Sequence, residues 1–186
     1  MVKDDRLLVI TGVNFRKTAL EVRNKFSLTT ENIKRIYEDI EGENPDDFFI
    51  LSTCNRTEIY SITSQPEQLI RLLARNGQGD EEEVRNNTYT KSGNEAIKHL
   101  FHVASGLDSQ ILGDCEIIGQ LKNAYMLAKA NDCISGLMEK GVNSALQASR
   151  QVRKNTSISD GTTSTSYAVI QFLRKEIGDL EAMHIC

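Results

Sequence analysis

The residues best suited to chemistry lie in the stretch LSTCNRTEIY, residues 51–60. A short apolar run before it predicts a buried strand, and Cys54 follows where that strand stops. Hydroxyl, amide and guanidinium groups surround the cysteine in sequence, from Thr53, Asn55 and Arg56. A cation beside a thiol favours the thiolate, which is the nucleophilic form. The stretch therefore indicates a reactive cysteine; the alternative is a small buried residue that ends a strand.

A second polar stretch, ASGLDSQILGDCEIIGQ, covers residues 104–120. Its glycines alternate with polar side chains, a pattern that a buried helix does not need. Glycine lets the backbone approach a ligand closely, so one interpretation is a loop that binds a small polar ligand. The other is a turn followed by a helix whose start is capped by Asp114. The spacing matches neither a dinucleotide-binding turn nor a phosphate-binding loop.

Two histidines, His99 and His102, stand three residues apart in a predicted helix and share one of its faces. His99 is a candidate to orient a thiol or to transfer a proton near neutral pH. A zinc site would have to combine both histidines with Cys54, and no other residues have the spacing of metal ligands. We therefore expect no metal, and His102 is expected at the surface. The alternative for His99 is a half-buried structural histidine.

The elements that must position these residues mix strands and helices in the first half of the chain. Strands are predicted at 7–10, 48–51, 58–62 and 88–91, and helices at 18–23, 31–40, 66–73 and 92–104. The acidic stretch 76–87 is predicted to be an exposed loop. From residue 116 onward the pattern is helical, with a break at 131–132, a hydroxyl-rich joint at 155–166 and a further helix at 167–177. The fold class is thus α+β, a small, mostly antiparallel sheet with packed helices followed by a helical subdomain.

The composition is that of an ordinary globular chain of 186 residues, with 39% hydrophobic residues and a net charge of −4. This length fits one domain, or one domain and part of the next. The negative charge argues against a general nucleic-acid binder but allows a local basic patch. Four scattered cysteines and a start unlike a signal peptide favour reduced thiols in the cytoplasm. No apolar run is long enough for a membrane span, so no membrane association is expected.

The motifs STCNRTEIY and GLDSQILGDCEIIGQLKNAY resemble glutamyl-tRNA reductase, the first committed enzyme of the five-carbon route to tetrapyrroles such as haem. The resemblance runs from the opening ITGVNFRKTALEVR to NTSISDGTTSTS. It implies a catalytic N-terminal domain over residues 1–154. Residues 155–186 would then hold a hinge, the start of a long spinal helix and the edge of an NADPH-binding domain, which the full-length family adds together with a dimerisation domain. The resemblance thus implies a homodimer for the full-length family and an NADPH site outside this fragment.

The resemblance also assigns roles to individual residues. Cys54 matches the nucleophile, and His99 matches a histidine that is important for activity. Arg56 is the candidate to hold the glutamate carboxylate. The implied substrate-binding residues are Thr53, Asn55, Arg56, Ser109, Asp114, Cys115, Glu116 and Gln120. Many members have Glu-Pro-Gln where this chain has residues 114–116, so Cys115 replaces an imino acid and adds a second thiol.

In the reaction that the resemblance implies, Cys54 attacks the ester of glutamyl-tRNA(Glu), giving a thioester that NADPH reduces to glutamate-1-semialdehyde. The fragment alone would form the thioester without reducing it. The next enzyme, glutamate-1-semialdehyde aminomutase, is a candidate partner. Two alternatives stay open, a cysteine hydrolase that uses Cys54 with His99, and a non-catalytic regulatory or tRNA-binding fragment. For tRNA docking, the basic helix end at residues 150–154 is a candidate.

Overall fold

The computed structural model describes residues 5–39, 45, 47–159 and 165–177. Its centre is a four-stranded sheet in the order β2-β3-β1-β4, with every neighbouring pair antiparallel. The strands are β1 Leu7–Asn14, β2 Phe48–Ser52, β3 Arg56–Thr63 and β4 Tyr89–Ser92. The predicted α+β class is therefore confirmed.

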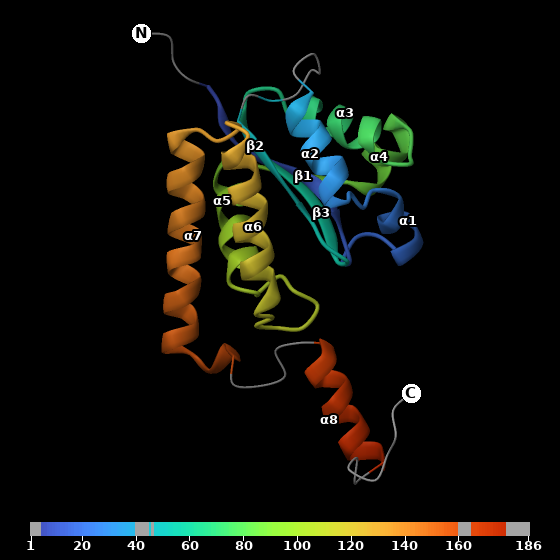
Figure 1. The fold of residues 1–186 in the computed structure, drawn as a ribbon, viewed down its shortest axis with the longest axis vertical. Helices are drawn as coiled ribbons and strands as arrows, with labels where there is room; N and C mark the ends of the chain where they lie inside the picture. Colours follow the sequence, from blue (N-terminus) through green and yellow to red (C-terminus); the bar gives the residue numbers. More distant parts are fainter. Residues whose placement is uncertain (1–4, 40–44, 46, 160–164, 178–186) are drawn as a thin grey trace.

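Helices cover both faces of this sheet (Figure 1). Their bounds are α1 Leu20–Lys25, α2 Thr30–Glu38, α3 Glu67–Asn76, α4 Glu81–Asn87, α5 Gly93–Ala104, α6 Glu116–Ala130, α7 Gly136–Asn155 and α8 Thr165–Ile177, with a short 3-10 turn η1 at Ser157–Ser159. On one face α5 packs on β1 and β4, α6 packs on β2, and α7 lies against α5. On the other face α3 packs on β1 and β3.

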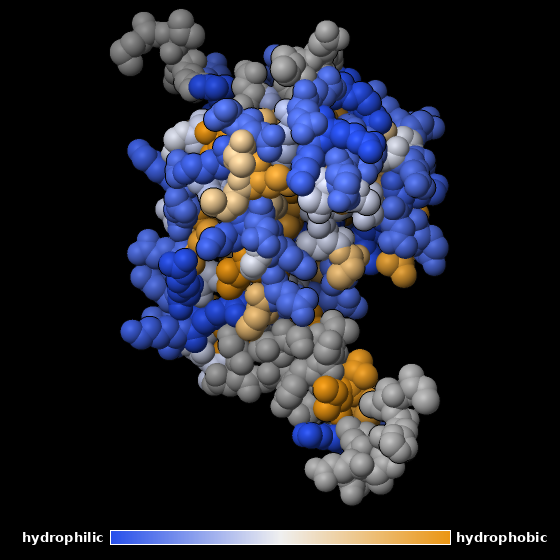
Figure 2. All heavy atoms as spheres, in the orientation of Figure 1, coloured by the Kyte–Doolittle hydropathy of each residue, from blue (hydrophilic) through white to orange (hydrophobic). Residues whose placement is uncertain are grey.

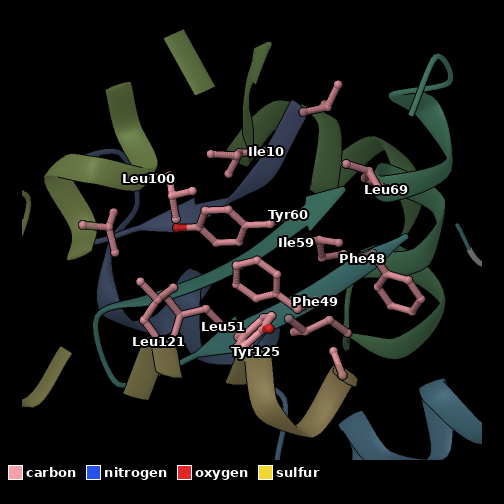
Figure 3. Packing of buried hydrophobic residues seen from close by; sticks show 14 of the residues in the cluster. Ile10, Phe48, Phe49, Leu51, Ile59, Tyr60, Leu69, Leu100, Leu121 and Tyr125 are labelled. Atoms are coloured by element: carbon pink, nitrogen blue, oxygen red, sulfur yellow. The ribbon is translucent and has the colours of Figure 1, made fainter. Parts of the chain in front are cut away.

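The pleat of β3 sends alternate side chains to the two faces, as a strand with a period of two requires. Tyr60 lies on the side of α5 and α6, whereas Ile59 lies on the side of Leu69 in α3 (Figure 3). All three of these side chains are completely buried. Arg56 and Glu58 stand four and two residues before Tyr60, so their side chains lie on the same face of β3 as Tyr60. The strand therefore directs their charged groups into the layer between the sheet and helices α5 and α6.

The helix starts show which local signals in the sequence were reliable. Thr29 caps α2, since its hydroxyl accepts a hydrogen bond from the N–H of Asn32 at 3.2 Å. The helix predicted after Ser92 is present as α5, but the Ser92 side chain makes no capping hydrogen bond. Ile97 shares the helix with the buried Leu100 but is itself 46% exposed.

The prediction of an exposed loop at 76–87 is wrong, because residues 81–87 form the helix α4. The Asp80 side chain caps it by accepting from the N–H of Glu83 at 2.8 Å. Glutamates in the first turn suit the positive end of the helix dipole, and Val84 is completely buried. The capped, amphipathic pattern was present in the sequence but was hidden by the flanking glycines.

At the C-terminal side, α8 stands apart from the layered body (Figure 1) and carries exposed apolar side chains, visible as an orange area in Figure 2. Val169, Ile170 and Phe172 are between 42% and 63% exposed. The strand edge predicted at 182–186 lies outside the described residues. None of the helices in the described ranges is long and apolar enough to span a lipid bilayer.

Candidate active site

Cys54 lies in the short loop that joins β2 to β3, and its side chain is exposed. The N–H of Thr53 donates to the carbonyl of Arg56 at 2.7 Å and closes this loop. The Thr53 hydroxyl accepts from the N–H groups of Asn55 and Arg56, both at 3.2 Å. From α1, Nε of Arg23 donates to the carbonyl of Cys54 at 3.0 Å. The backbone around the cysteine is therefore fixed, while its thiol remains accessible.

Arg56, two residues after the cysteine, is only 1% exposed and lies between two carboxylates. Its Nη1 donates to Oε1 of Glu58 at 3.0 Å and to Oδ2 of Asp108 at 3.1 Å, and Nη2 donates to the carbonyl of Asp108. The guanidinium predicted to hold a substrate carboxylate is thus already paired with carboxylates of this chain. Asp108 is shared, because its other oxygen accepts from Nε of Arg16 at 2.9 Å.

Glu58 is completely buried and is the acceptor at the centre of this network. Besides Arg56, its donors are Nε2 of His99 at 2.9 Å, the hydroxyl of Tyr60 at 2.5 Å and the hydroxyl of Tyr89. Burial acts to raise the pKa of the Glu58 carboxyl, but Arg56 and His99 outweigh it and lower the pKa from 4.5 to about 2. Because the ionised carboxylate only accepts, Nε2 of His99 carries the proton.

The two tyrosines act as neutral donors to Glu58. Burial, followed by the charge of Glu58, raises the pKa of Tyr60 and of Tyr89 well above the usual 10. Each phenol therefore keeps its proton throughout the physiological range. Glu58, His99, Tyr60 and Tyr89 form one hydrogen-bonded cluster under the end of the sheet where Cys54 lies, which we call the Glu58 cluster.

Gly12 gives the Glu58 cluster its space. It is paired across the sheet with Glu58 on β3 and with Tyr89 on β4. A Cβ at this position would lie 2.3 Å from the carbonyl of Thr57 and 2.9 Å from Cγ of Glu58. Only glycine therefore allows the Glu58 side chain to lie over β1.

The segment between α5 and α6, residues 105–115, is a loop folded back on itself. Gly106 and Gly113 have φ of 71° and 80°, and the N–H of Gly113 donates to the carbonyl of Gly106 at 3.0 Å. This fold brings Asp108 onto Arg56, as described above, and leaves Ser109 half-buried next to it. The two polar stretches singled out in the sequence are therefore in contact.

The start of α6 is held by hydrogen bonds from α7, in addition to the packing of α6 on β2. Arg153 donates from Nη2 to the carbonyl of Asp114 at 2.8 Å and from Nη1 to Sγ of Cys115 at 2.6 Å. The Asp114 side chain accepts from the N–H of Glu116 at 2.9 Å, and Glu116 itself is exposed. Gln120 lies apart from the Glu58 cluster, in a separate hollow of about 390 Å³ between α2, β2 and α6.

A pocket of about 560 Å³ opens directly on the Glu58 cluster. Tyr89 and His99 line it together with Asp108, Asn14 and the exposed His102. In the part of the chain that the structure describes, the Cys54 thiol makes no hydrogen bond, to His99 or to any other group. The same residues include no cluster of three or more His, Cys, Asp or Glu side chains suited to a metal, so the zinc alternative gains no support.

Sequence reasoning missed four members of this site, Glu58, Tyr60, Tyr89 and Asp108. The signal for Glu58 was its position two residues after Arg56, which puts both on the same face of a strand. Asp108 was noted in the glycine-rich stretch but was not chosen as a site residue. Nothing local indicated Tyr89, because its contact with Glu58 spans 31 residues of sequence.

Comparison with known proteins gives consistent results. The family profile described as "Glutamyl-tRNAGlu reductase, N-terminal domain" matches residues 11–156. The glutamyl-tRNA reductase of Flavobacterium psychrophilum is 41% identical over 174 residues, which cover 94% of this chain and 42% of the relative. That of Aquifex aeolicus is 34% identical over 177 residues, covering 94% of this chain and 43% of the relative. Among solved structures, glutamyl-tRNA reductase from Methanopyrus kandleri superimposes with a TM-score of 0.70 at 27% identity, over 93% of this chain and 41% of that one. The chain thus spans about two fifths of the length of these relatives.

Proposed function

This chain belongs to the glutamyl-tRNA reductase family, and we propose from that membership that Cys54 accepts the glutamyl group of glutamyl-tRNA as a thioester. The observation that carries the proposal is an accessible thiol on a fixed loop, next to a buried, fully hydrogen-bonded charge network. A reaction that depends on angle and distance benefits from a nucleophile whose backbone cannot move. Roles for the other site residues are part of the same proposal.

The chemical step is a transesterification onto sulfur. A bond forms between Sγ of Cys54 and the glutamyl carbonyl carbon, and the bond from that carbon to the ribose oxygen breaks. The thiol loses one proton and the leaving ribose hydroxyl gains one, so the step needs no outside oxidant or reductant. His99 is proposed to contribute to this step from its place in the Glu58 cluster, with its ring held by the ionised Glu58 and without a direct hydrogen bond to the Cys54 thiol.

Substrate binding is proposed to use the residues around the loop and the start of α6, which are Thr53, Asn55, Arg56, Ser109, Asp114, Cys115, Glu116 and Gln120. For Arg56 to hold a substrate carboxylate, Asp108 must give up its 3.1 Å contact. Arg16, 55% exposed, offers Asp108 a second cationic partner at 2.9 Å. We therefore propose that the substrate carboxylate replaces the Asp108 side chain on Arg56.

Reduction of the thioester is not assigned to these residues. The sequence contains no G-x-G-x-x-G turn of the kind that holds a dinucleotide, so it does not fit NADPH. In the longer relatives, NADPH is proposed to act from the part that this chain does not match. We likewise propose homodimer formation and contact with glutamate-1-semialdehyde aminomutase for the full-length protein, and we assign neither to residues of this chain.

The experiment is incubation of the 186-residue chain with glutamyl-tRNA, with and without NADPH, followed by intact-mass and peptide mass spectrometry. We expect one glutamyl adduct, on Cys54, and no semialdehyde. Cys54→Ser should abolish the adduct, whereas the matched control Cys133→Ser, at a half-buried thiol remote from the loop, should retain it. An adduct that persists in Cys54→Ser would show that Cys54 is not the nucleophile. Semialdehyde formed by this chain alone would show that reduction does not need the part of the relatives that this chain does not match.

The hydrolase alternative has less structural support. It requires His99 to receive the proton of Cys54 through a hydrogen bond, and Nε2 of His99 is instead bonded to Glu58. Turnover of simple glutamyl esters or amides in the absence of tRNA would favour it. A non-catalytic binding role would be favoured if Cys54→Ser changed no measurable property.

A further inference from the structure

We infer that the 560 Å³ pocket beside the Glu58 cluster binds the terminal phosphodiester groups of the tRNA acceptor end. This inference rests on the proposed function and says where its substrate is held. The basic side chains that line the pocket are Arg16, Lys17, Lys91 and Lys98. The acidic ones are Glu95 and Asp108, in a chain whose net charge is −4. The net charge of the side chains that line the pocket is thus positive, opposite in sign to the net charge of the whole molecule.

The cations come from three separate elements that converge on the pocket. Asn14, at the end of β1, accepts from the N–H groups of Arg16 and Lys17 at 3.2 Å and shapes the turn that presents both. Lys91 comes from β4 and Lys98 from α5. A solvated row of charges on one helix would need no such convergence. Three elements that turn like charges toward one hollow indicate a site for an anion.

Counting partners shows which cations are available. Asp108 is already shared between Arg16 and Arg56, and Lys17 donates to the carbonyl of Thr88 at 2.5 Å. Among the described residues, Lys91 and Lys98 take part in no ion pair. Lys91 lies 5.8 Å from the centre of the Tyr89 ring, which limits where its ammonium can go. These two lysines are the groups that an incoming phosphate would meet.

The position of the pocket suits a phosphate next to the reacting ester. The N–H of Phe15 donates to the carbonyl of Asn55 at 2.9 Å, so the turn that bears Arg16 touches the loop that bears Cys54. In an aminoacyl-tRNA the ester is on the terminal ribose. The nearest phosphate is on the 5′ side of that same nucleoside, and the next phosphate lies one nucleotide further along the strand. Phosphate contacts position a nucleic acid and supply most of its affinity. Anchoring these phosphates would place the ester carbonyl beside the sulfur.

The test compares two glutamyl donors on the double variant Lys91→Gln/Lys98→Gln. Glutamyl-tRNA carries the phosphates, and 2′(3′)-O-glutamyl-adenosine lacks them. We expect the rate of Cys54 acylation by glutamyl-tRNA, relative to that by glutamyl-adenosine, to fall about tenfold at low salt. The concentration of glutamyl-tRNA that gives half the maximal acylation rate rises with salt. The slope of its logarithm against log salt should be smaller by about 1.4 in the variant, near 0.7 for each lost contact to a single strand.

A binding measurement keeps the inference testable apart from catalysis. The dinucleotide pCpA, which bears the phosphates but no glutamyl group, should bind the unmodified chain and bind the double variant about tenfold more weakly. The matched control is Lys122→Gln/Lys140→Gln, which removes two exposed lysines from α6 and α7, outside the pocket, and should leave both the pCpA affinity and the rate ratio unchanged.

Three other results would contradict either the phosphate site or the proposed function. Equal pCpA binding by the parent and the Lys91→Gln/Lys98→Gln variant, or a loss seen only in the control variant, would overturn the pocket assignment. An equal loss with glutamyl-adenosine would also overturn it, since the pocket would then hold the glutamyl carboxylate. Absence of acylation by either donor, with pCpA binding intact, would refute the proposed function and leave the phosphate site standing.

Discussion

At the scale of single residues, the site is built around a carboxylate that water does not reach. Glu58 accepts from an arginine, a histidine and two tyrosines, so every donor near it has a partner. A buried charge of this kind is tolerated only when it is paired and hydrogen-bonded. Its consequence for function is positional, because it fixes Arg56 and His99 in the layer beneath the Cys54 loop.

Replacing Glu58 with glutamine should therefore be costly. The neutral amide would leave Arg56 with Asp108 as its only anionic partner, and the amide N–H₂ would face a tyrosine donor. We expect Glu58→Gln to lower the free energy of unfolding by about 3 kcal/mol at pH 7. Urea unfolding measures this, with Glu95→Gln as the exposed control expected to change stability by less than about 0.5 kcal/mol. Equal stability of the two variants would show that the cluster does not hold the fold.

At the scale of elements, two tight approaches fix the loop of residues 105–115 and the start of α6. One is Gly113, whose Cβ, if it had one, would lie 2.1 Å from the carbonyl of Ile158 in η1. The other is Arg153 on α7, which donates to Asp114 and Cys115. The loop that contacts Arg56 is therefore positioned by the helical subdomain and not by the sheet alone.

Substitution of glycine by alanine should distinguish a glycine that is required by close packing, Gly113, from one that is not, Gly119. Gly113→Ala combines a positive φ with a clash against backbone, so we expect a loss of about 2 to 4 kcal/mol in the free energy of unfolding. Gly119→Ala, on α6, would meet nothing within 4 Å and should raise stability by about 0.5 to 1 kcal/mol through helix propensity. Thermal unfolding of both variants tests the pair. A Gly113→Ala protein as stable as Gly119→Ala would show that η1 can move away.

The contacts of Arg153 can be tested by local rather than global stability. Arg153→Ala removes a charged hydrogen bond to a carbonyl, worth about 1.5 kcal/mol, so the backbone around residues 113–116 should exchange its amide protons about tenfold faster. Hydrogen exchange read by mass spectrometry measures this, and Arg150→Ala, three residues earlier on α7, should leave exchange there unchanged. The same acceleration in both variants would point to a general weakening of α7.

The elements also show why sequence reasoning located this site only in part. The second strand of the hairpin was predicted from residue 58, but β3 begins at Arg56. With Arg56 outside the predicted strand, its shared face with Glu58 was invisible, and so was the cluster. The contact of Arg56 with Asp108 joins residues 52 apart, which no local pattern encodes. The α4 helix was missed although Asp80 and Glu83 stand at capping distance, because glycines on its N-terminal side suggested a loop.

At the scale of the whole molecule, long motifs carried more information than single residues. The family resemblance and the α+β class drawn from the sequence are confirmed by the family profile, by the relatives and by the superimposed structure. The roles of individual site residues stay predictions, since a shared fold does not fix which side chain does the chemistry. The domain boundary predicted at residue 154 stays a prediction in the same way.

Stability of the whole chain should depend on pH through the Glu58 cluster. The pKa of Glu58 is lowered from 4.5 to about 2 in the folded chain, so its ionised form stabilises the fold above pH 4.5. This stabilisation is lost as the pH falls toward 2, because the unfolded chain takes up the proton first. A shift of this size corresponds to about 3 kcal/mol, of which about 2 kcal/mol should be gone by about pH 3.

The difference between the parent and Glu58→Gln should therefore shrink in acid. At pH 7 we expect the variant to be less stable by about 3 kcal/mol, and at pH 3 by only about 1 kcal/mol, since glutamine has no proton to gain. Urea unfolding of both proteins at pH 7, 5, 4 and 3 measures the two curves, with Glu95→Gln expected to run parallel to the parent. Curves for the parent and Glu58→Gln that stay parallel down to pH 3 would mean that the carboxyl of Glu58 is not held ionised by Arg56 and His99.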